Sequence, residues 1–344
     1  MSLTVRQAGP ADEAAWEAFA QERATAFHRL AWGRATEATH GHEAVNLMAE
    51  RGGEVVGILP LTDKRSAIFG RALISVAFTV GGGAAALDDE ARDALLARAG
   101  EEGRARGSDY VELRGGAVPE GWVAKEGTYA EFGCPLTDDQ DAQLKAIPRK
   151  KRADVRKAIK AAAEGSIEAR VTNDLDGFWK HYAIAQRDHG TPVLPKALLA
   201  RLMQGLGDSV EIAEVFAGGE RMAGVMSVYH RGTVHLYHAY IGPEARRHHA
   251  GDYLYYWMMG HARSKGCGWF DLGRSKTGTG SYAYKTYWGM EPRPMSYAYL
   301  MLGAEEMPDI NPNNPKFKLM TQVWSKLPMP VANLMGPRLY GHLG

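Results

Sequence analysis

The chain has 344 residues, 45% of them hydrophobic, and its 41 Lys and Arg nearly balance its 40 Asp and Glu. This length favours two domains that each bury a core, and the balanced charge argues against nucleic-acid binding across the whole surface. No stretch approaches the roughly eighteen apolar residues of a membrane-spanning helix, and the N-terminus lacks the basic leader and apolar core of a signal peptide, so we expect a cytoplasmic protein.

The first half of the chain predicts an α/β unit. An apolar stretch from Leu47 to Leu61 surrounds Gly52-Gly53, which predicts two strands joined by a turn. A helix is expected over 88–106, followed by a strand over 110–113. The glycines at 81–83 are similar to a phosphate cradle, but the acids that begin the helix at Asp88 already occupy its positive dipole end, so we expect no phosphate there.

The second half repeats this order after a basic helix expected over 147–165. Strands are predicted around Gly218-Gly219 and over Thr233–Ile241, where β-branched and aromatic residues dominate. A helix over 253–265 and a strand over 269–272 complete the unit. Cys134 and Cys267 lie far apart without zinc-ligand spacing, so we expect two buried free thiols and no metal site.

Two short matches indicate an internal duplication. Residues 107–113, Gly-Ser-Asp-Tyr-Val-Glu-Leu, recur as residues 266–272, Gly-Cys-Gly-Trp-Phe-Asp-Leu, with the glycine, an aromatic residue, an acid and the leucine in the same places. Residues 52–57 recur at a similar interval as residues 218–224. Either match alone can arise by chance, but both in order predict two related α/β units with mixed sheets.

A loop rich in cations runs from the strand over 233–241 into the next helix. Arg246 and Arg247 precede Ala250 and Gly251 at the expected helix start, where unpaired backbone N–H groups and the dipole favour phosphate oxygens. The segment resembles the pyrophosphate-binding loop of GNAT acyltransferases, although alanine replaces its first glycine and Asp252 its last. The resemblance implies acyl-CoA as a cosubstrate and no tightly bound cofactor. A plain capped helix with solvated arginines is the alternative.

The segment from Phe270 to Pro292 is the most specific in the chain. A strand ending in Asp271 leads through a Gly/Ser/Thr-rich loop to Tyr284-Lys285 and then to Trp288-Gly289. This resembles the signature of the Fem family, the aminoacyl and acyl transferases of the bacterial envelope. Residues 147–165 and 64–83 resemble its connecting helix and first-domain loop, and Arg187 to Pro192, with His189, resembles a substrate loop of the FemAB-like subgroup found beside exopolysaccharide (PEP-CTERM) genes.

The resemblance implies tandem duplicated GNAT-like (acyl-CoA N-acyltransferase) α/β units with mixed sheets, of Fem type. Four segments are expected: a first domain over 1–145 that forms a scaffold and acceptor cleft, a basic helix over 146–170, a donor-binding catalytic domain over 171–303, and a tail over 304–344. The tail mixes Lys with Phe, Leu, Met, Val and Trp. This composition suits a membrane interface but equally a segment that folds back over the second domain.

Acyl transfer to an amine needs a base and a stabiliser for the tetrahedral oxyanion. Lys285 is the expected stabiliser, and Asp271 and His238 are the candidate bases, although His238 in an aromatic strand is as well explained by packing. Arg274 suits a phosphate or carboxylate of either substrate. The remaining expected substrate contacts are Ser275, Tyr284, Trp288, Arg187 and His189, and the donor contacts are Arg246, Arg247, Ala250 and Gly251.

Three functions remain open on these grounds. The first is an N-acyltransferase that moves an acyl group from acyl-CoA to a lipid amine, with a bacterial ceramide synthase acting on a sphingoid base as its sharpest form, peripheral on the inner membrane. The second is an aminoacyl-tRNA-dependent transferase acting on a peptidoglycan precursor, favoured by the basic helix but weakened by the absence of the family's coiled-coil arm. The third is an accessory protein of exopolysaccharide export.

Overall fold

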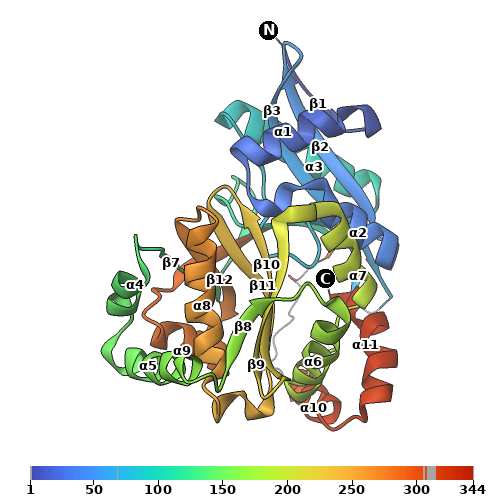
Figure 1. The fold of residues 1–344 in the computed structure, drawn as a ribbon. Helices are drawn as coiled ribbons and strands as arrows, with labels where there is room; N and C mark the ends of the chain where they lie inside the picture. The colour runs from blue at the N-terminus through green and yellow to red at the C-terminus, as the bar shows by residue number, and fades with distance from the viewer. Residues whose placement is uncertain (1, 68, 305–306, 308–314, 344) are drawn as a thin grey trace.

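The computed structural model describes residues 2–67, 69–304, 307 and 315–343 (Figure 1). Its first half forms an α/β unit of seven strands covered by helices. In chain order the elements are β1 (Leu3–Gln7), η1 (Pro10–Asp12), α1 (Glu13–Arg23), η2 (Ala26–His28), α2 (Leu30–His40), β2 (Glu43–Arg51), β3 (Glu54–Ser66), β4 (Gly70–Ser75), β5 (Ala85–Ala86), α3 (Asp89–Ala105), β6 (Tyr110–Arg114) and β7 (Val123–Pro135).

The second half begins with two connecting helices and ends in a helical tail. Its elements are α4 (Gln140–Ala146), α5 (Arg149–Ala163), β8 (Glu168–Val171), α6 (Leu175–Asp188), α7 (Lys196–Leu206), η3 (Gly207–Ser209), β9 (Val210–Ala217), β10 (Glu220–His230), β11 (Thr233–Ile241), η4 (Pro243–Arg246), α8 (Ala250–Ser264), β12 (Trp269–Lys276), α9 (Gly280–Tyr287), β13 (Arg293–Met301), α10 (Pro315–Trp324) and α11 (Met329–Leu343). These elements confirm the expected strands, helices and α/β class.

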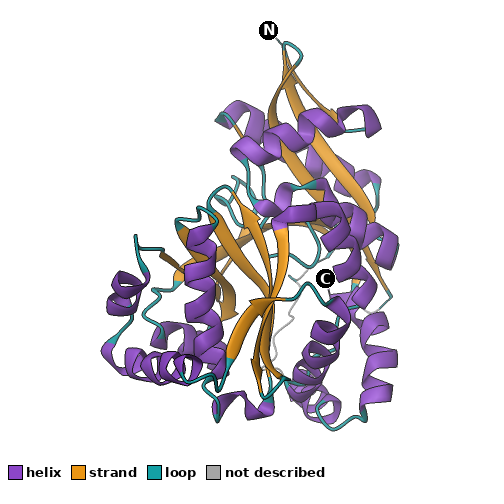
Figure 2. Ribbon diagram, in the orientation of Figure 1, coloured by secondary structure: helices purple, strands orange, loops and turns teal. Residues whose placement is uncertain are grey.

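The strands of both halves join in one mixed sheet (Figure 2). Their order is β1-β2-β3-β4-β6-β13-β7-β12-β11-β10-β9-β8, with β5 paired to β3. The halves exchange strands at the centre: β7 pairs with β12 of the second half, and β13 pairs with β6 of the first. Because β7 and β13 also pair with each other, the ladder of backbone hydrogen bonds runs unbroken between the halves.

The duplication detected in the sequence corresponds to equivalent structure. Gly107 and Gly266 follow α3 and α8 with φ of 66° and 81°, the left-handed conformation that ends a helix and that only glycine adopts without strain. The strand after each glycine then pairs in parallel with an earlier strand of its own half, β6 with β4 and β12 with β11; β11 is the last strand before α8, whereas the two-residue β5 stands between β4 and α3. Glu112 and Asp271, the acids of the repeat, each stand at the last residue pair of their ladder.

Helices cover both faces of the second-half sheet. Figure 1 shows α5, α8 and α9 on one side and α6, α7 and α11 on the other, and the core divides accordingly into a cluster around Leu254 and Phe270 and another around Phe178 and Leu202. The second cluster also contains Trp32 of α2, so it ties the halves together. Within the described ranges, no helix combines the length and apolarity needed to cross a membrane.

Candidate active site

The two parallel strands β11 and β12 of the second half diverge after a short paired segment. They pair through only three residues each, ending with His235 opposite Asp271. Just beyond that point both strands carry a β-bulge, since Tyr237 has no partner on β10 and Leu272 none on β7. Bulges bend and twist a strand, so the strands diverge. A cavity of about 350 Å³ opens between residues 235–239 of β11 and 271–274 of β12.

His235 and Asp271 form a hydrogen-bonded pair at the point of divergence. Nδ1 of His235 lies 2.6 Å from Oδ2 of Asp271, and Oδ1 of the same carboxylate accepts the backbone N–H of Gly273 at 2.7 Å. The two side chains are 15% and 13% exposed. A carboxylate at this nitrogen favours the tautomer that carries its proton on Nδ1. Nε2 of His235 is then a proton acceptor on the edge of the cavity, as a general base requires.

Lys285 lines the same cavity, with its ammonium against the backbone of β12. Its helix α9 begins after Thr279, whose hydroxyl accepts the N–H of Tyr282 at 3.4 Å. Nζ of Lys285 donates to the carbonyls of Gly273 and Arg274, each at 2.9 Å, which leaves one of its three N–H bonds for a ligand. Burial lowers the pKa of Lys285 to about 8; the Asp271 carboxylate opposes this shift and Arg274 adds to it.

Arg274 brings a second cation to the cavity. Its guanidinium lies over the ring of Tyr129, 4.6 Å from the centroid, and donates to the hydroxyl of Tyr297. No carboxylate of the described chain lies within ion-pair distance of it. Burial and then the charge of Arg114 lower the pKa of Arg274. A half-buried guanidinium without a carboxylate partner is suited to an anionic or oxygen-rich ligand group.

His238 lines the same cavity but, unlike His235, has no carboxylate partner in the described chain. Its Nδ1 lies 3.0 Å from the hydroxyl of Tyr182, while Nε2 is buried and has no hydrogen-bond partner among the residues that the structure describes. Burial lowers the pKa of His238 to about 3, so the ring is neutral near pH 7. Ser275, the next predicted contact, is buried in β12 and is not part of the cavity wall.

The opposite wall comes from the first half and the tail. Phe27, Phe78 and Val80 line the cavity together with Tyr340 of α11. Tyr340 stacks on Phe78 with ring centroids 5.0 Å apart, and the hydroxyl of Tyr237 donates to the Phe78 carbonyl at 3.0 Å. The glycine loop at 81–83, from which we expected no phosphate site, packs beside these residues: a Cβ at Gly81 would approach the Phe27 ring to 3.1 Å.

The expected donor loop lies at the start of α8. Arg247 is 80% exposed and pairs with Glu244 at 2.8 Å, and Arg246 ends η4 one residue before it. Ala250 and Gly251 are the first residues of α8, and no side chain caps this end of the helix. Its first N–H groups are therefore available to an anion. Tyr255, one turn further along α8, lines the cavity, whereas Arg246, Arg247, Ala250 and Gly251 do not.

Tyr284 and Trp288 surround a lysine instead of the cavity. Nζ of Lys151, from the basic helix α5, lies 4.7 Å from the Tyr284 ring centroid and 4.9 Å from that of Trp288. It also forms an ion pair with Asp252 in the first turn of α8. Although Lys151 belongs to a run of cations in the sequence, it is only 3% exposed. The pair holds α5 against α8 and balances the acid at the helix start.

Arg187 and His189 lie where α6 ends, against the tail. Arg187 donates to the Leu327 carbonyl at 3.0 Å and pairs with Asp188. A Cβ at the neighbouring Gly190 would meet Thr321 of α10 at 2.2 Å. Neither Arg187 nor His189 lines the cavity between β11 and β12. The structure thus brings together Asp271, His238, Arg274 and Lys285 of the predicted site and adds His235, which the sequence analysis did not select.

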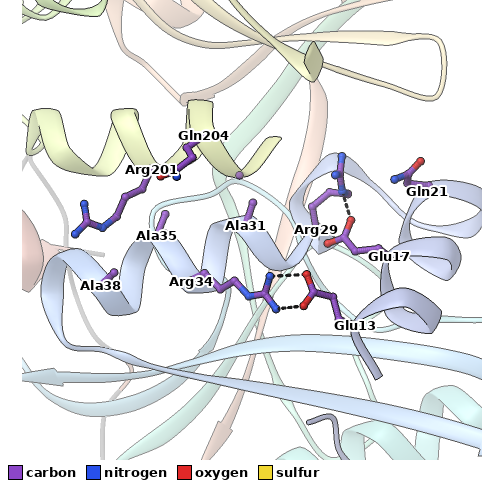
Figure 3. Close-up of a pocket in the computed structure, with 11 residues that line it drawn as sticks. Glu13, Glu17, Gln21, Arg29, Ala31, Arg34, Ala35, Ala38, Arg201 and Gln204 are labelled. Carbon is purple, nitrogen blue, oxygen red and sulfur yellow. Dashed lines mark hydrogen bonds and ion pairs between the residues drawn. The ribbon is translucent and has the colours of Figure 1, made fainter. Parts of the chain in front are cut away.

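A second groove, of about 510 Å³, lies between α1, α2 and α7 (Figure 3). Its charged groups are largely paired, since Glu13 receives two 2.7 Å hydrogen bonds from Arg34 and Glu17 bonds to Arg29. Ala31 and Ala35 of α2 face α7 across it. These small side chains let the two helices approach, so the groove is the seam where the halves pack.

Comparison with known proteins agrees with this geometry. Residues 149–286 match the family model described as an acetyltransferase (GNAT) domain. The crystal structure of FemX superposes with a TM-score of 0.68 at 15% identity, covering 94% of this chain and 100% of that chain. The C-terminal domain of a putative lysylphosphatidylglycerol synthetase from Agrobacterium fabrum superposes with a TM-score of 0.58 at 14% identity, covering 84% of this chain and 91% of that chain.

A tandem GNAT protein from the clavulanic acid biosynthesis pathway superposes with a TM-score of 0.50 at 12% identity, covering 89% of this chain and all of that one. No curated protein matches the chain in sequence. At such identities the superpositions establish the fold, which is the expected Fem-type arrangement of tandem GNAT units. Four residues of the cavity, His235, Asp271, Arg274 and Lys285, fall inside the matched range, whereas Phe27, Phe78, Val80 and Tyr340 of its wall lie outside it.

Proposed function

We propose that this chain, a FemAB-like member of the GNAT acyltransferase superfamily, moves an acyl group from acyl-CoA to the amine of a lipid at the divergence of β11 and β12. N-acyl transfer in general follows from the family. The observation that carries the finer proposal is that the His235–Asp271 pair and Lys285 line one cavity. A base and a cation beside one reacting carbonyl are what aminolysis of a thioester requires.

The chemistry assigns a role to each group. The amine nitrogen attacks the thioester carbonyl, a C–N bond forms, and the carbonyl electrons move to the oxygen, where the Lys285 ammonium stabilises the negative charge. Nε2 of His235 accepts the proton that the amine loses, while Asp271 stabilises the imidazolium that results. The C–S bond then breaks, the thiolate of coenzyme A leaves, and the proton held by His235 balances its charge.

Donor and acceptor are expected to approach from opposite sides. The uncapped start of α8, with Arg246, Arg247, Ala250 and Gly251, suits the diphosphate of coenzyme A. The acceptor side is apolar and aromatic, because Phe27, Phe78, Val80 and Tyr340 line it. Such a wall suits an amine attached to an aliphatic chain, and Arg274 suits a hydroxyl, phosphate or carboxylate oxygen beside that amine. A sphingoid base is the sharpest form of this acceptor.

One structural neighbour is a domain of a putative lysylphosphatidylglycerol synthetase, whose name denotes a lipid product. It adds support for a lipid acceptor. The test is mass spectrometry of lipids from the host with this gene deleted, then complemented with the wild type or with Lys285→Ala. Loss of N-acylated lipids and accumulation of the free amine, reversed by the wild type alone, would support the proposal. An unchanged lipid profile would contradict the proposal that the acceptor is a lipid amine.

A second candidate is transfer from an aminoacyl-tRNA, and α5 favours it. Lys157 and Lys160 are 62% and 76% exposed on this helix and form only long ion pairs, with Asp154 at 3.7 Å and Glu164 at 3.6 Å, and FemX is a structural neighbour. Exposed lysines in such weak surface pairs can bind a phosphate backbone instead. If this candidate is right, Lys157→Glu/Lys160→Glu will abolish transfer from a charged tRNA. If acyl-CoA is the donor, the same variant will turn over acyl-CoA at the wild-type rate.

A further inference from the structure

The tail helices present an apolar face to solvent. On α11, Val331, Leu334 and Met335 are 38%, 61% and 44% exposed. Together with the exposed Arg338 they follow the spacing i, i+3, i+4, i+7, which places them on one side of a helix. On α10, Met320 and Val323, three residues apart, are 63% and 55% exposed. We call these six residues the tail face.

The other side of α11 is fixed to the body of the protein. Ala332 is 2% exposed, and a Cβ at Gly336 would lie 3.0 Å from the backbone nitrogen of Val193. Near the end of the helix the carbonyl of Gly341 lies 2.8 Å from Nε2 of His42 in the first half. The tail face is therefore a surface held in place by the fold, and α11 has one side for the protein and one side without a partner in the described chain.

The charge of the tail selects the kind of partner. From residue 316 to the end, the sequence contains Lys316, Lys318, Lys326 and Arg338 and no Asp or Glu, whereas the whole chain is nearly neutral. Cations at the margin of an apolar helix face are typical of helices that lie in the plane of an anionic bilayer, because long basic side chains reach the headgroups while apolar side chains enter the lipid.

A second copy of the chain fits less well. A two-fold contact between tail faces would bring Arg338 and Lys326 of both copies together with no acid from either tail to pair them. We propose that the tail face docks on an anionic lipid surface. This docking is separate from the proposed reaction, but it has a consequence for it. Tyr340, which lines the cavity, follows Leu334 by about 9 Å along α11, so a docked tail holds the cavity close to the lipid surface.

Vesicle flotation with the full chain tests the docking. The vesicles contain phosphatidylglycerol and phosphatidylcholine in one set and phosphatidylcholine alone in the other. The variant is Leu334→Glu/Met335→Glu, which removes two apolar contacts and adds two negative charges at exposed positions. The matched control is Leu87→Glu, because Leu87 is 54% exposed in the first half, away from the tail. Circular dichroism melting and analytical ultracentrifugation accompany each sample.

We expect the wild type and Leu87→Glu to float with the anionic vesicles and to stay unbound with phosphatidylcholine alone. The double variant should bind about a hundredfold more weakly with an unchanged melting temperature. The proposal is overturned if the wild type does not float, if the double variant floats equally well, or if the wild type forms a dimer that the double variant dissociates. A wild type that floats but never consumes acyl-CoA contradicts the proposed function alone, and an active enzyme that never floats contradicts the docking alone.

Discussion

Replacing His235 by glutamine removes the imidazole while leaving Asp271 bonded to the Gly273 N–H. A positioned general base contributes about 10² to 10⁴ in rate, so kcat should fall by that factor, which corresponds to ~2.7–5.4 kcal/mol in the barrier. In Asp271→Asn the amide N–H faces Nδ1, so the ring carries its proton on Nε2 and can no longer accept one. Because the two residues act as one unit, the double variant should lose little more than either single variant.

The assay is release of the coenzyme A thiol at saturating acyl-CoA with varied amine. In a second series, with acyl-CoA varied at saturating amine, the KM for acyl-CoA should stay unchanged, since the proposed donor contacts lie at α8. His261→Gln is the matched control, because His261 forms a similar pair with Glu211 at 2.8 Å, is 21% exposed, and lies outside the cavity. If His235→Gln retains kcat within about threefold, His235 is not the general base. If the losses in kcat of the two single variants multiply in the double variant, His235 and Asp271 do not act as one unit.

Three more predictions concern Lys285, Cys134 and Lys151. Because burial lowers the pKa of Lys285 to about 8, kcat/KM should fall as the pH rises through about 8 and the cation is lost; a pH–rate profile in which Lys285→Arg does not move this limb upward would contradict the role. Burial raises the pKa of Cys134 to about 11, so iodoacetamide at pH 8 should leave turnover intact, whereas inactivation that Cys134→Ala prevents would show a reactive thiol. Lys151→Met leaves Asp252 without its cation and should lower the free energy of unfolding in urea by about 3 kcal/mol. Lys157→Met, on the exposed side of α5, should lower it by less than about 0.5 kcal/mol. Equal losses of stability in the two variants would argue against a stabilising role for the buried Lys151–Asp252 pair.

The fold was largely accessible from local sequence signals. Gly107 and Gly266 each end a helix in the left-handed conformation, and glycine is the residue that tolerates it, so the repeat carried structural information. The exchange of β7 and β13 was not accessible, because no local pattern records which half a strand pairs with. Strand pairing over such separations is decided by the packing of the complete sheet.

The site could be predicted from the sequence only in part, because some of its residues come together only through strand pairing. Lys285 and Asp271 lie in one motif, whereas His235 joins them only through the parallel pairing of β11 with β12. Strand alternation predicts that His235 and His238 point to opposite faces, but the bulge at Tyr237 changes the alternation and both line the cavity. The sequence did not distinguish Lys151 from the other cations of its run, because its partner, Asp252, is distant in sequence.

The proposed reaction is acyl transfer at the divergence of β11 and β12. Its most direct test is to incubate the purified protein with long-chain acyl-CoA and a sphingoid base and to measure the amide product by mass spectrometry, for the wild type, His235→Gln and Lys285→Ala. We predict amide and free coenzyme A in equal amounts from the wild type and a loss of at least about a hundredfold in both variants. Equal product from all three proteins would contradict the claim, since the chemistry would then lie elsewhere in the molecule.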